Sequence, residues 1–369
     1  MKKLPIAFYL PSLRGGGAER VMVTLANGFA ERGLAIDLVL AKAEGPYLND
    51  VAPGVRVVDL GSRRVLASLP ALVRYLRATR PRVMLSALNH ANIIAIAARV
   101  LARVPARLIV SEHNNVSLPG RASRSLRERA VLPLMRWAYP RADGVVAVSG
   151  GVADDLARAA NLARERITVV YNPVVTPGLL EQASAPFEHP WFGASSSPVV
   201  LAVGRLTEQK DFATLIHAFA KVRARRPCRL VILGEGELRA ELETLVAKLG
   251  LSADVALPGF SGNPFTWMGS ATLFVLSSAW EGLPTVLIEA MACTTPVVST
   301  DCPSGPAEIL EDGRWGRLVP VGDVDALADA MLATLAETTH PDVASRAQDF
   351  GVEQAVAGYL QILGSGRHL

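Results

Sequence analysis

The chain has little cysteine, few aromatic residues and no long uninterrupted apolar run. Its 369 residues include three cysteines, Cys228, Cys293 and Cys302, which form no CxxC pair and no metal-ligand spacing. This usage suits a reducing compartment and argues against a disulfide scaffold. The longest apolar region, 83–100, contains Asn and Arg residues and is therefore a poor membrane span. Aromatic residues make up 6% of the chain, which provides few stacking platforms for nucleic acid.

The overall composition indicates a compact globular protein of two domains. Half of the residues are apolar and 20% are charged, and 369 residues are enough for two hydrophobic cores. The net charge of +4 conceals an asymmetry, because residues 1–180 carry 25 Lys and Arg against 12 Asp and Glu, a net +13, whereas residues 181–369 carry a net −9. A basic half beside an acidic half suggests that one domain faces an anionic membrane or nucleic acid. Arginines scattered over solvated helix faces are the alternative explanation.

Strand and helix patterns alternate along the whole chain. Apolar runs at 6–10, 35–40, 55–60, 83–86 and 107–112 predict strands, and amphipathic segments lie between them. Because the first run continues into Gly15 and lacks a cleavage site, we interpret it as a strand and not as a signal peptide. The alternation predicts doubly wound parallel sheets, which bind ligands at the carboxyl ends of their strands.

Two glycine loops between a strand and a helix have the form of phosphate-binding sites. Gly15-Gly16-Gly17 follows the strand 6–10, and Gly204 follows the strand 198–203. Glycines let the loop backbone approach a ligand, and the helix N-terminus offers N–H groups. The first loop lacks the G-x-G-x-x-G spacing and a ribose-binding carboxylate on the next strand, which disfavours a nicotinamide dehydrogenase.

A third loop of this kind follows the apolar run 271–276. It contains Glu281, and Pro284 stands near the first turn of the next helix, where its missing N–H costs little. Backbone N–H groups at Thr285 and Val286 would face a phosphate. Glu281 and Glu289 flank that position and suit the hydroxyls of a sugar and a ribose, so the stretch suggests a nucleotide-sugar site.

The pair Glu281-x7-Glu289 resembles the EX7E motif of retaining family 4 glycosyltransferases, which have the GT-B fold. The segment from Gly204 and Arg205 to Lys210 and Asp211 also resembles that family, as do the Gly-Gly-Ala-Glu loop at 16–19 and Gly234-x-Gly236. The likeness covers nearly the whole chain and is most specific over 200–310. It implies two Rossmann-like domains with a cleft between them: an acceptor domain at 1–175, a linker at 176–197 and a donor domain at 198–349. The last helix, 350–363, is expected to cross back onto the first domain.

The resemblance also implies a role for each candidate residue. Arg205 and Lys210 would stabilise the leaving diphosphate, Glu281 would hold sugar hydroxyls, Glu289 the ribose, and His113, directly after the strand 107–112, the sugar. The remaining donor-binding candidates are backbone or loop residues: Gly16, Gly17, Gly204, Gly234, Gly236, Phe260, Gly282, Leu283, Pro284, Thr285 and Val286. No cofactor or metal is expected, and Asp323, which begins an Asp-Val-Asp triplet, is predicted to cap a helix.

The segment 118–139 is basic, amphipathic and rich in arginine. Arg121, Arg124, Arg127 and Trp137 would suit the surface of an anionic membrane, with Pro133 dividing the segment into two short helices. Packing of its apolar face into the core is the alternative.

The sequence therefore predicts a retaining glycosyltransferase. It would move an N-acetylhexosamine or a hexose from a UDP-sugar to a lipid-linked or polysaccharide acceptor, as a peripheral protein at the cytoplasmic membrane face. Two alternatives remain at this point: a nucleotide-sugar epimerase of the same fold, and a nucleic-acid-binding protein with a basic surface.

Overall fold

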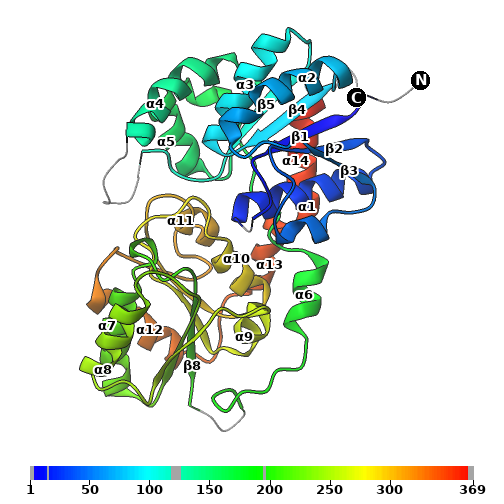
Figure 1. The fold of residues 1–369 in the computed structure, drawn as a ribbon. Helices are drawn as coiled ribbons and strands as arrows, with labels where there is room; N and C mark the ends of the chain where they lie inside the picture. Colours follow the sequence, from blue (N-terminus) through cyan, green and yellow to red (C-terminus); the bar gives the residue numbers. More distant parts are fainter. Residues whose placement is uncertain (1–3, 15, 118–125, 194–196, 365–369) are drawn as a thin grey trace. The chain divides into compact units, whose positions relative to one another are not determined.

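A computed structural model describes residues 4–14, 16–117, 126–193 and 197–364, with the backbone alone for 126–130. The chain forms two compact units. The first comprises Met1–Pro173 together with Val352–Leu369, and the second comprises Val174–Gly351. Each unit is a parallel sheet flanked by helices (Figure 1).

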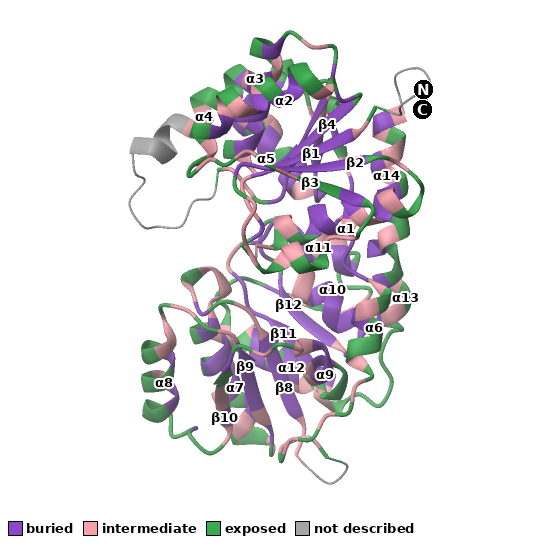
Figure 2. Ribbon diagram, turned by 45° about the vertical axis from the view of Figure 1, so that its right-hand side comes forward, coloured by how far each residue is buried: buried purple, intermediate pink, exposed green. Residues whose placement is uncertain are grey.

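The described part of the first unit contains a seven-stranded parallel sheet in the order β3-β2-β1-β4-β5-β6-β7. Its strands are β1 (Ile6–Leu10), β2 (Ile36–Leu40), β3 (Val55–Asp59), β4 (Val83–Ala87), β5 (Arg107–Glu112), β6 (Gly144–Ala147) and β7 (Ile167–Val169). The central strands are buried on both faces, purple in Figure 2, which is why they appear as continuous apolar runs in the sequence. Ile6 pairs with Ile36 on one side and with Val83 on the other, so the strand order reverses at β1.

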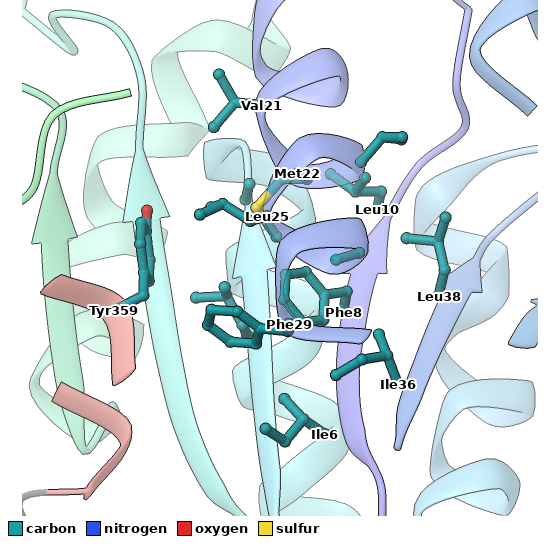
Figure 3. Close-up of a cluster of buried hydrophobic side chains, with 14 of the residues drawn as sticks. Ile6, Phe8, Leu10, Val21, Met22, Leu25, Phe29, Ile36, Leu38 and Tyr359 are labelled. Carbon is teal, nitrogen blue, oxygen red and sulfur yellow. The ribbon is translucent and has the colours of Figure 1, made fainter. Parts of the chain in front are cut away.

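The helices of this unit cover both faces of the sheet. They are α1 (Gly17–Glu31), α2 (Leu69–Thr79), α3 (Asn89–Ala102), α4 (Leu126–Ala138), α5 (Gly150–Ala160) and α14 (Val352–Gly364). α14 packs beside α1, and its residues Val356 and Tyr359 join the cluster that contains Phe8 and Phe29 (Figure 3). This shared core explains why α14, the last helix in the chain, belongs to the first unit.

The second unit, over residues 174–193 and 197–351, holds a six-stranded parallel sheet in the order β10-β9-β8-β11-β12-β13. Its strands are β8 (Val199–Val203), β9 (Arg229–Leu233), β10 (Val255–Gly259), β11 (Leu273–Leu276), β12 (Val297–Thr300) and β13 (Arg317–Val319). Its helices are α6 (Pro177–Ala183), α7 (Phe212–Arg225), α8 (Arg239–Lys248), α9 (Pro264–Ser270), α10 (Thr285–Ala292), α11 (Pro306–Leu310), α12 (Val324–Ala336) and α13 (Val343–Ala347). The strand order reverses between β8 and β11.

Residues 176–197, which the sequence suggested as a linker, lie within the second unit. Thr176 caps α6 by accepting a hydrogen bond from the backbone N–H of Leu179 at 3.1 Å. Asn263 donates to the carbonyl of Gln182 at 3.0 Å, and the ring of Phe187 lies 4.9 Å from that of Trp267. These contacts tie the segment to α9, although its proline and serine content is typical of a connection between domains.

The prediction of two short helices around Pro133 is wrong, because α4 is one helix that contains this proline. The proline lacks one backbone donor but does not end the helix, whose residues Met135 and Ala138 are fully buried. Asp323 does cap α12, as predicted, since its side chain accepts from the N–H of Ala326 at 2.9 Å. In the described part of the chain, no helix combines the length and the apolar character needed to cross a membrane.

Candidate functional site

Several predicted donor residues of the second unit lie at the point where its strand order reverses. Gly204 and Arg205 directly follow β8, and the loop that holds Glu281 follows the neighbouring strand β11. Open α/β sheets bind ligands at this place, because the loops from the two adjacent strands run to opposite faces of the sheet and leave room between them. The fold thus brings together groups that lie about seventy residues apart in the sequence.

Lys210 and Glu281 form a largely buried ion pair at this point. Nζ of Lys210 donates to Oε1 of Glu281 at 2.5 Å, and the side chains are 15% and 8% exposed. The hydroxyl of Ser278 donates to the same oxygen at 2.6 Å, and Gln209 donates to the carbonyl of Trp280 at 3.0 Å. Burial weakens screening by water, so the pair is held firmly in one geometry. Arg205 is exposed and forms no ion pair within the described part of the chain, which leaves its guanidinium available to an anion.

A cavity of about 320 Å³ lies at the carboxyl ends of β8, β9 and β10. Its walls include Gly204, Arg205, Gly234, Glu235 and Phe260. The ring of Phe260 is 83% exposed, which is unusual for a large apolar side chain and suits a flat ligand that stacks on it. The volume falls at the lower end of the range for small-molecule sites.

Close backbone packing forms the inner wall of this cavity. Gly234 has φ +139°, and a Cβ built on it would lie 1.9 Å from the carbonyl oxygen of Gly204. A side chain at position 234 would therefore force the β8 and β9 loops apart. A Cβ built on Gly236 would likewise lie 2.3 Å from the carbonyl oxygen of Leu206.

The N-terminus of α10 stands next to the ion pair. Pro284, which was expected near the first turn, is its N-cap residue, so the backbone N–H groups of Thr285 and Val286 belong to the first turn, which lacks intrahelical acceptors. Gly305, with φ +100°, packs against Pro284, where a Cβ would lie 2.4 Å from the proline Cδ. Thr300 also donates to the carbonyl of Ser278 at 2.7 Å. The loop after β12 thus fixes the turn that carries Glu281.

His113, the candidate of the first unit, follows β5 directly and is 7% exposed. Its Nε2 lies 3.1 Å from Oγ of Ser111, and that oxygen lies 2.9 Å from the hydroxyl of Tyr359. Its Nδ1 is buried and has no partner among the described residues. Burial lowers the pKa of His113 to about 4, so the imidazole is neutral near pH 7.

Glu112 points to the opposite face of β5 and belongs to a separate buried cluster. Tyr139 and Asn92 both donate to its Oε1, the latter at 3.0 Å. Burial raises the pKa of Glu112 to about 7, and the two donors only partly oppose this shift. The carboxyl group therefore takes up its proton at a higher pH than an exposed glutamate does.

The glycine loop of the first unit also begins a helix. Gly16 is the N-cap residue of α1 and Gly17 its first residue, and the carbonyl of Gly16 accepts from the N–H of Arg20 at 3.2 Å. The carboxylate of Glu19 folds back over Gly16, where a Cβ would lie 1.9 Å from it. Gly16, Gly17 and His113 belong to the first unit and the other donor candidates to the second.

The membrane candidates are only partly visible. Arg121 and Arg124 lie outside the described residues, and the side chain of Arg127 does as well. Trp137 is 44% exposed on α4, with the guanidinium of Arg141 lying 4.6 Å from the centre of its ring. The exposed tryptophan is the one member of this set whose side chain the structure describes.

Several residues at these sites were absent from the sequence prediction. Gln209 and Ser278 surround Glu281, and Ser111 and Tyr359 contact His113. Ser278, Ser111 and Tyr359 are hydroxyl residues within or beside apolar stretches, and a buried hydroxyl needs a hydrogen-bond partner. That rule could have identified the hydroxyl residues as members of buried hydrogen bonds. It could not have identified the partner of each one. Gln209 lies in a polar stretch and gives no such signal.

Two family models match the chain, and they match different units. The description "Glycosyltransferase Family 4" applies to residues 15–176, and "Glycosyl transferases group 1" applies to residues 197–337. The first match ends close to the junction between the units at Pro173 and Val174, and the second begins at residue 197, within the second unit.

Relatives and solved structures agree with these matches. The chain is 30% identical to the Campylobacter jejuni N-acetylgalactosamine-N,N'-diacetylbacillosaminyl-diphospho-undecaprenol 4-alpha-N-acetylgalactosaminyltransferase, over 91% of this chain and 90% of the relative. It is 28% identical to the lipopolysaccharide core biosynthesis glycosyltransferase LpsE of Rhizobium meliloti, over 95% and 97% of the two chains. The fold is similar to that of Anabaena HepE solved with UDP and glucose, at a TM-score of 0.76 and 23% identity over 98% and 100% of the two chains.

Proposed function

The chain is a glycosyltransferase of family 4 with the GT-B fold that the sequence predicted, and from this premise we propose that it transfers a sugar from a UDP-sugar to a lipid-linked or polysaccharide acceptor. The sugar is an N-acetylhexosamine or a hexose, and its anomeric configuration is retained. The relatives described above are named as transferases, so they lend no support to the epimerase alternative.

The observation that carries the proposal is the buried pair of Lys210 and Glu281 at the strand reversal of the second unit. A nucleotide-sugar needs a cation for its diphosphate and a carboxylate for its sugar hydroxyls, within one diphosphate length of each other. The pair, the cavity walled by Gly204 and Phe260, and the start of α10 supply these groups on one edge of one sheet. The base would occupy the cavity, stacked on Phe260, and Glu289 would hold the ribose.

Departure of the diphosphate is the step that this arrangement suits. As the bond from the anomeric carbon to the diphosphate breaks, negative charge grows on the leaving oxygen. Arg205, Lys210 and the N–H groups of Thr285 and Val286 would stabilise that charge without reorganising. The acceptor hydroxyl would attack on the face that the diphosphate leaves, and its proton would pass to the departing phosphate oxygen. This transfer of the sugar and the proton needs no covalent nucleophile and no metal.

The choice of donor and acceptor is supported by the relatives. Two C. jejuni relatives are named as N-acetylgalactosaminyltransferases, and both names specify a diphospho-undecaprenol acceptor. HepE was solved with UDP. We extend UDP and a lipid-linked acceptor to this chain, with the loop of Ser304 to Pro306 selecting the sugar.

Contact with a membrane would follow from a lipid-linked acceptor. Residues 1–180 carry a net charge of +13, and α4 exposes Leu134 and Trp137 to the surroundings. A basic surface with an exposed tryptophan suits anionic headgroups on the cytoplasmic side. The protein would therefore act as a peripheral membrane enzyme.

The test is nucleotide release from UDP-, GDP- and ADP-sugars, with and without anionic vesicles that carry polyprenyl-diphosphate sugars. UDP release that requires these vesicles is expected, and chelation of divalent cations should not reduce it. NMR of the product should give the anomeric configuration of the donor. Conversion of one UDP-sugar into another without release would instead support an epimerase, and salt-dependent oligonucleotide binding without release would support a nucleic-acid-binding protein.

A further inference from the structure

Three polar side chains form a line inside the first unit, from α14 to the end of β5. The hydroxyl of Tyr359 lies 2.9 Å from Oγ of Ser111, which lies 3.1 Å from Nε2 of His113. Ser111 and His113 are two residues apart at the end of a strand and so face the same side of the sheet. Figure 3 shows Tyr359 among apolar side chains, with its hydroxyl directed toward the carboxyl ends of the strands.

We propose that Tyr359, acting through Ser111, fixes His113 as the tautomer that carries its proton on Nδ1, so that Nδ1–H donates a hydrogen bond to an oxygen of the transferred sugar. Tyr359 and Ser111 are then positioning residues for His113. This inference rests on the proposed function in so far as it needs His113 at the sugar. The tautomer itself can be tested without any donor.

The direction of the hydrogen bonds follows from counting donors and acceptors. If Tyr359 donates to Ser111 and Ser111 donates to Nε2 of His113, only the hydrogen on Nδ1 lacks a partner. If His113 donates to Ser111 and Ser111 donates to Tyr359, the phenolic hydrogen and the lone pair of Nδ1 both lack partners. If both Tyr359 and His113 donate to Ser111, the serine hydrogen and the Nδ1 lone pair are unmatched. Because a buried unmatched polar group is unfavourable, the first arrangement is preferred.

Burial keeps Tyr359 protonated and His113 neutral, as this hydrogen-bond arrangement requires. Burial raises the pKa of Tyr359 to about 12, so the phenol retains the proton that it donates. The imidazole of His113 is neutral and has a single N–H to place. Glu112 points to the other face of β5 and accepts hydrogen bonds from Tyr139 and Asn92, so its carboxylate does not compete with Ser111 for His113.

The unmatched nitrogen is the link to a ligand. Nδ1 of His113 is covered by protein and yet has no partner among the described residues. Few buried polar atoms in native proteins lack a hydrogen-bond partner, and such an atom often marks a functional site. A sugar hydroxyl or ring oxygen that reaches His113 would accept this hydrogen, whereas the other tautomer would offer the sugar an acceptor only.

The experiment is nitrogen-15 NMR of the whole protein labelled at histidine and recorded without donor. The chain has six histidines, and His113→Gln identifies the signals of His113. The wild type should show a protonated Nδ1 and an unprotonated Nε2. Tyr359→Phe should populate both tautomers, because Ser111 loses the donor that orients its hydroxyl, and Ser111→Ala should abolish the preference for Nδ1–H. A wild-type protein protonated on Nε2, or an unchanged tautomer in both variants, would overturn the relay.

Tyr9→Phe is the matched control, because the hydroxyl of Tyr9 pairs with Ser68 at 2.6 Å in the same unit and contacts no histidine. It should lose thermal stability as Tyr359→Phe does and leave the His113 tautomer unchanged. In transfer assays, Ser111→Ala should lower kcat/KM about 3- to 10-fold, the effect of one hydrogen bond, and Tyr9→Phe should not. If Nδ1 is protonated in the wild type but His113→Asn retains full activity, only the contact between His113 and the sugar is overturned. The experiment therefore distinguishes a failure of that contact from a failure of the relay.

Discussion

Lys210 donates from Nζ to Oε1 of Glu281 at 2.5 Å across 71 positions of sequence, and this ion pair joins the loop after β8 to the loop after β11. Ser278 donates to the same oxygen, so Oε1 is occupied by two protein donors. A diphosphate that binds to Lys210 has to share it with Glu281. The pair therefore holds both side chains in place before the donor arrives, which reduces the reorganisation needed during catalysis.

Lys210→Ala is expected to lower kcat/KM by about 100- to 1000-fold, because it removes one cation from the leaving diphosphate. It also leaves the carboxylate of Glu281 buried without its ion-pair partner, which should destabilise the second unit by about 3 kcal/mol. Steady-state transfer assays and denaturant unfolding measure the two effects.

The matched control is Lys221→Ala. Lys221 pairs with Asp325 in the same unit, but the side chains are 47% and 78% exposed. Such a pair contributes little because water screens it, so both activity and stability should remain near the wild type. Activity within threefold of the wild type in Lys210→Ala would contradict the role given to Lys210.

Phe260→Ala is expected to raise the KM for the donor about tenfold and to leave kcat nearly unchanged, since stacking on a base contributes equally before and during the reaction. The ring is so exposed that its removal should not alter the melting temperature. Val321→Ala, a change at another exposed apolar residue of the unit, should have no effect on KM. An unchanged KM in Phe260→Ala would place the base elsewhere.

Gly234→Ala is expected to destabilise the second unit by about 2–4 kcal/mol and to weaken donor binding, because the new methyl group collides with the carbonyl of Gly204. Gly250→Ala separates this collision from backbone strain. Gly250 has φ +68° and open space around its Cβ, so its substitution should cost only about 1 kcal/mol. Equal unfolding free energies for the two variants would show that the collision is relieved.

Glu112 should make the stability of the first unit depend on pH. Its pKa is raised by burial from 4.5 to about 7, so between these values the folded chain keeps a proton that the unfolded chain has lost. Stability is therefore full below pH 4.5, falls as the pH rises to about 7 and is level above it, with a total loss of about 3 kcal/mol. Glu112→Gln retains the acceptor for Tyr139 and should remove this dependence.

His113 acts in the opposite sense. Its pKa is lowered by burial from 6.5 to about 4, so its contribution to stability is present above pH 6.5 and is lost as the pH falls toward 4. The two groups offset each other in the wild type between pH 4.5 and 6.5. Denaturant unfolding of wild type, Glu112→Gln and His113→Asn at several pH values should resolve the two slopes, and parallel profiles for all three proteins would refute both shifts.

Local patterns predicted most of the elements because they need no partner. The apolar runs of β1, β4, β5 and β8 specify buried parallel strands wherever they pair. β13 was not predicted, because three residues are too few to form a recognisable apolar run. Its pairing with β12 stabilises it as a strand. The segment 176–197 was assigned as a linker because its prolines suggest a connection, whereas contacts with Trp267 and Asn263 give it a structure.

The candidate site could be predicted residue by residue but not as pairs. Glu281 and Lys210 were each identified from a loop at the end of a strand. Their ion pair depends on which strands are neighbours in the sheet, and local sequence does not determine the strand order. Tyr359 illustrates the same limit, since it lies 248 positions from Ser111 and reaches it only because α14 packs beside α1.

The return of α14 to the first unit has a consequence for synthesis on the ribosome. The sheet of Met1–Pro173 leaves the exit tunnel without the helix that covers Phe8 and Phe29, and that helix follows only after all of Val174–Gly351 has been made. At elongation rates of about 5–20 residues per second this delay is on the order of ten seconds or more. During that time the nascent first unit exposes an apolar strip where Val356 and Tyr359 will pack, a natural binding place for a chaperone. Chains stalled just before Val352 should therefore be cleaved by protease in the first unit more readily than chains released with α14 in place.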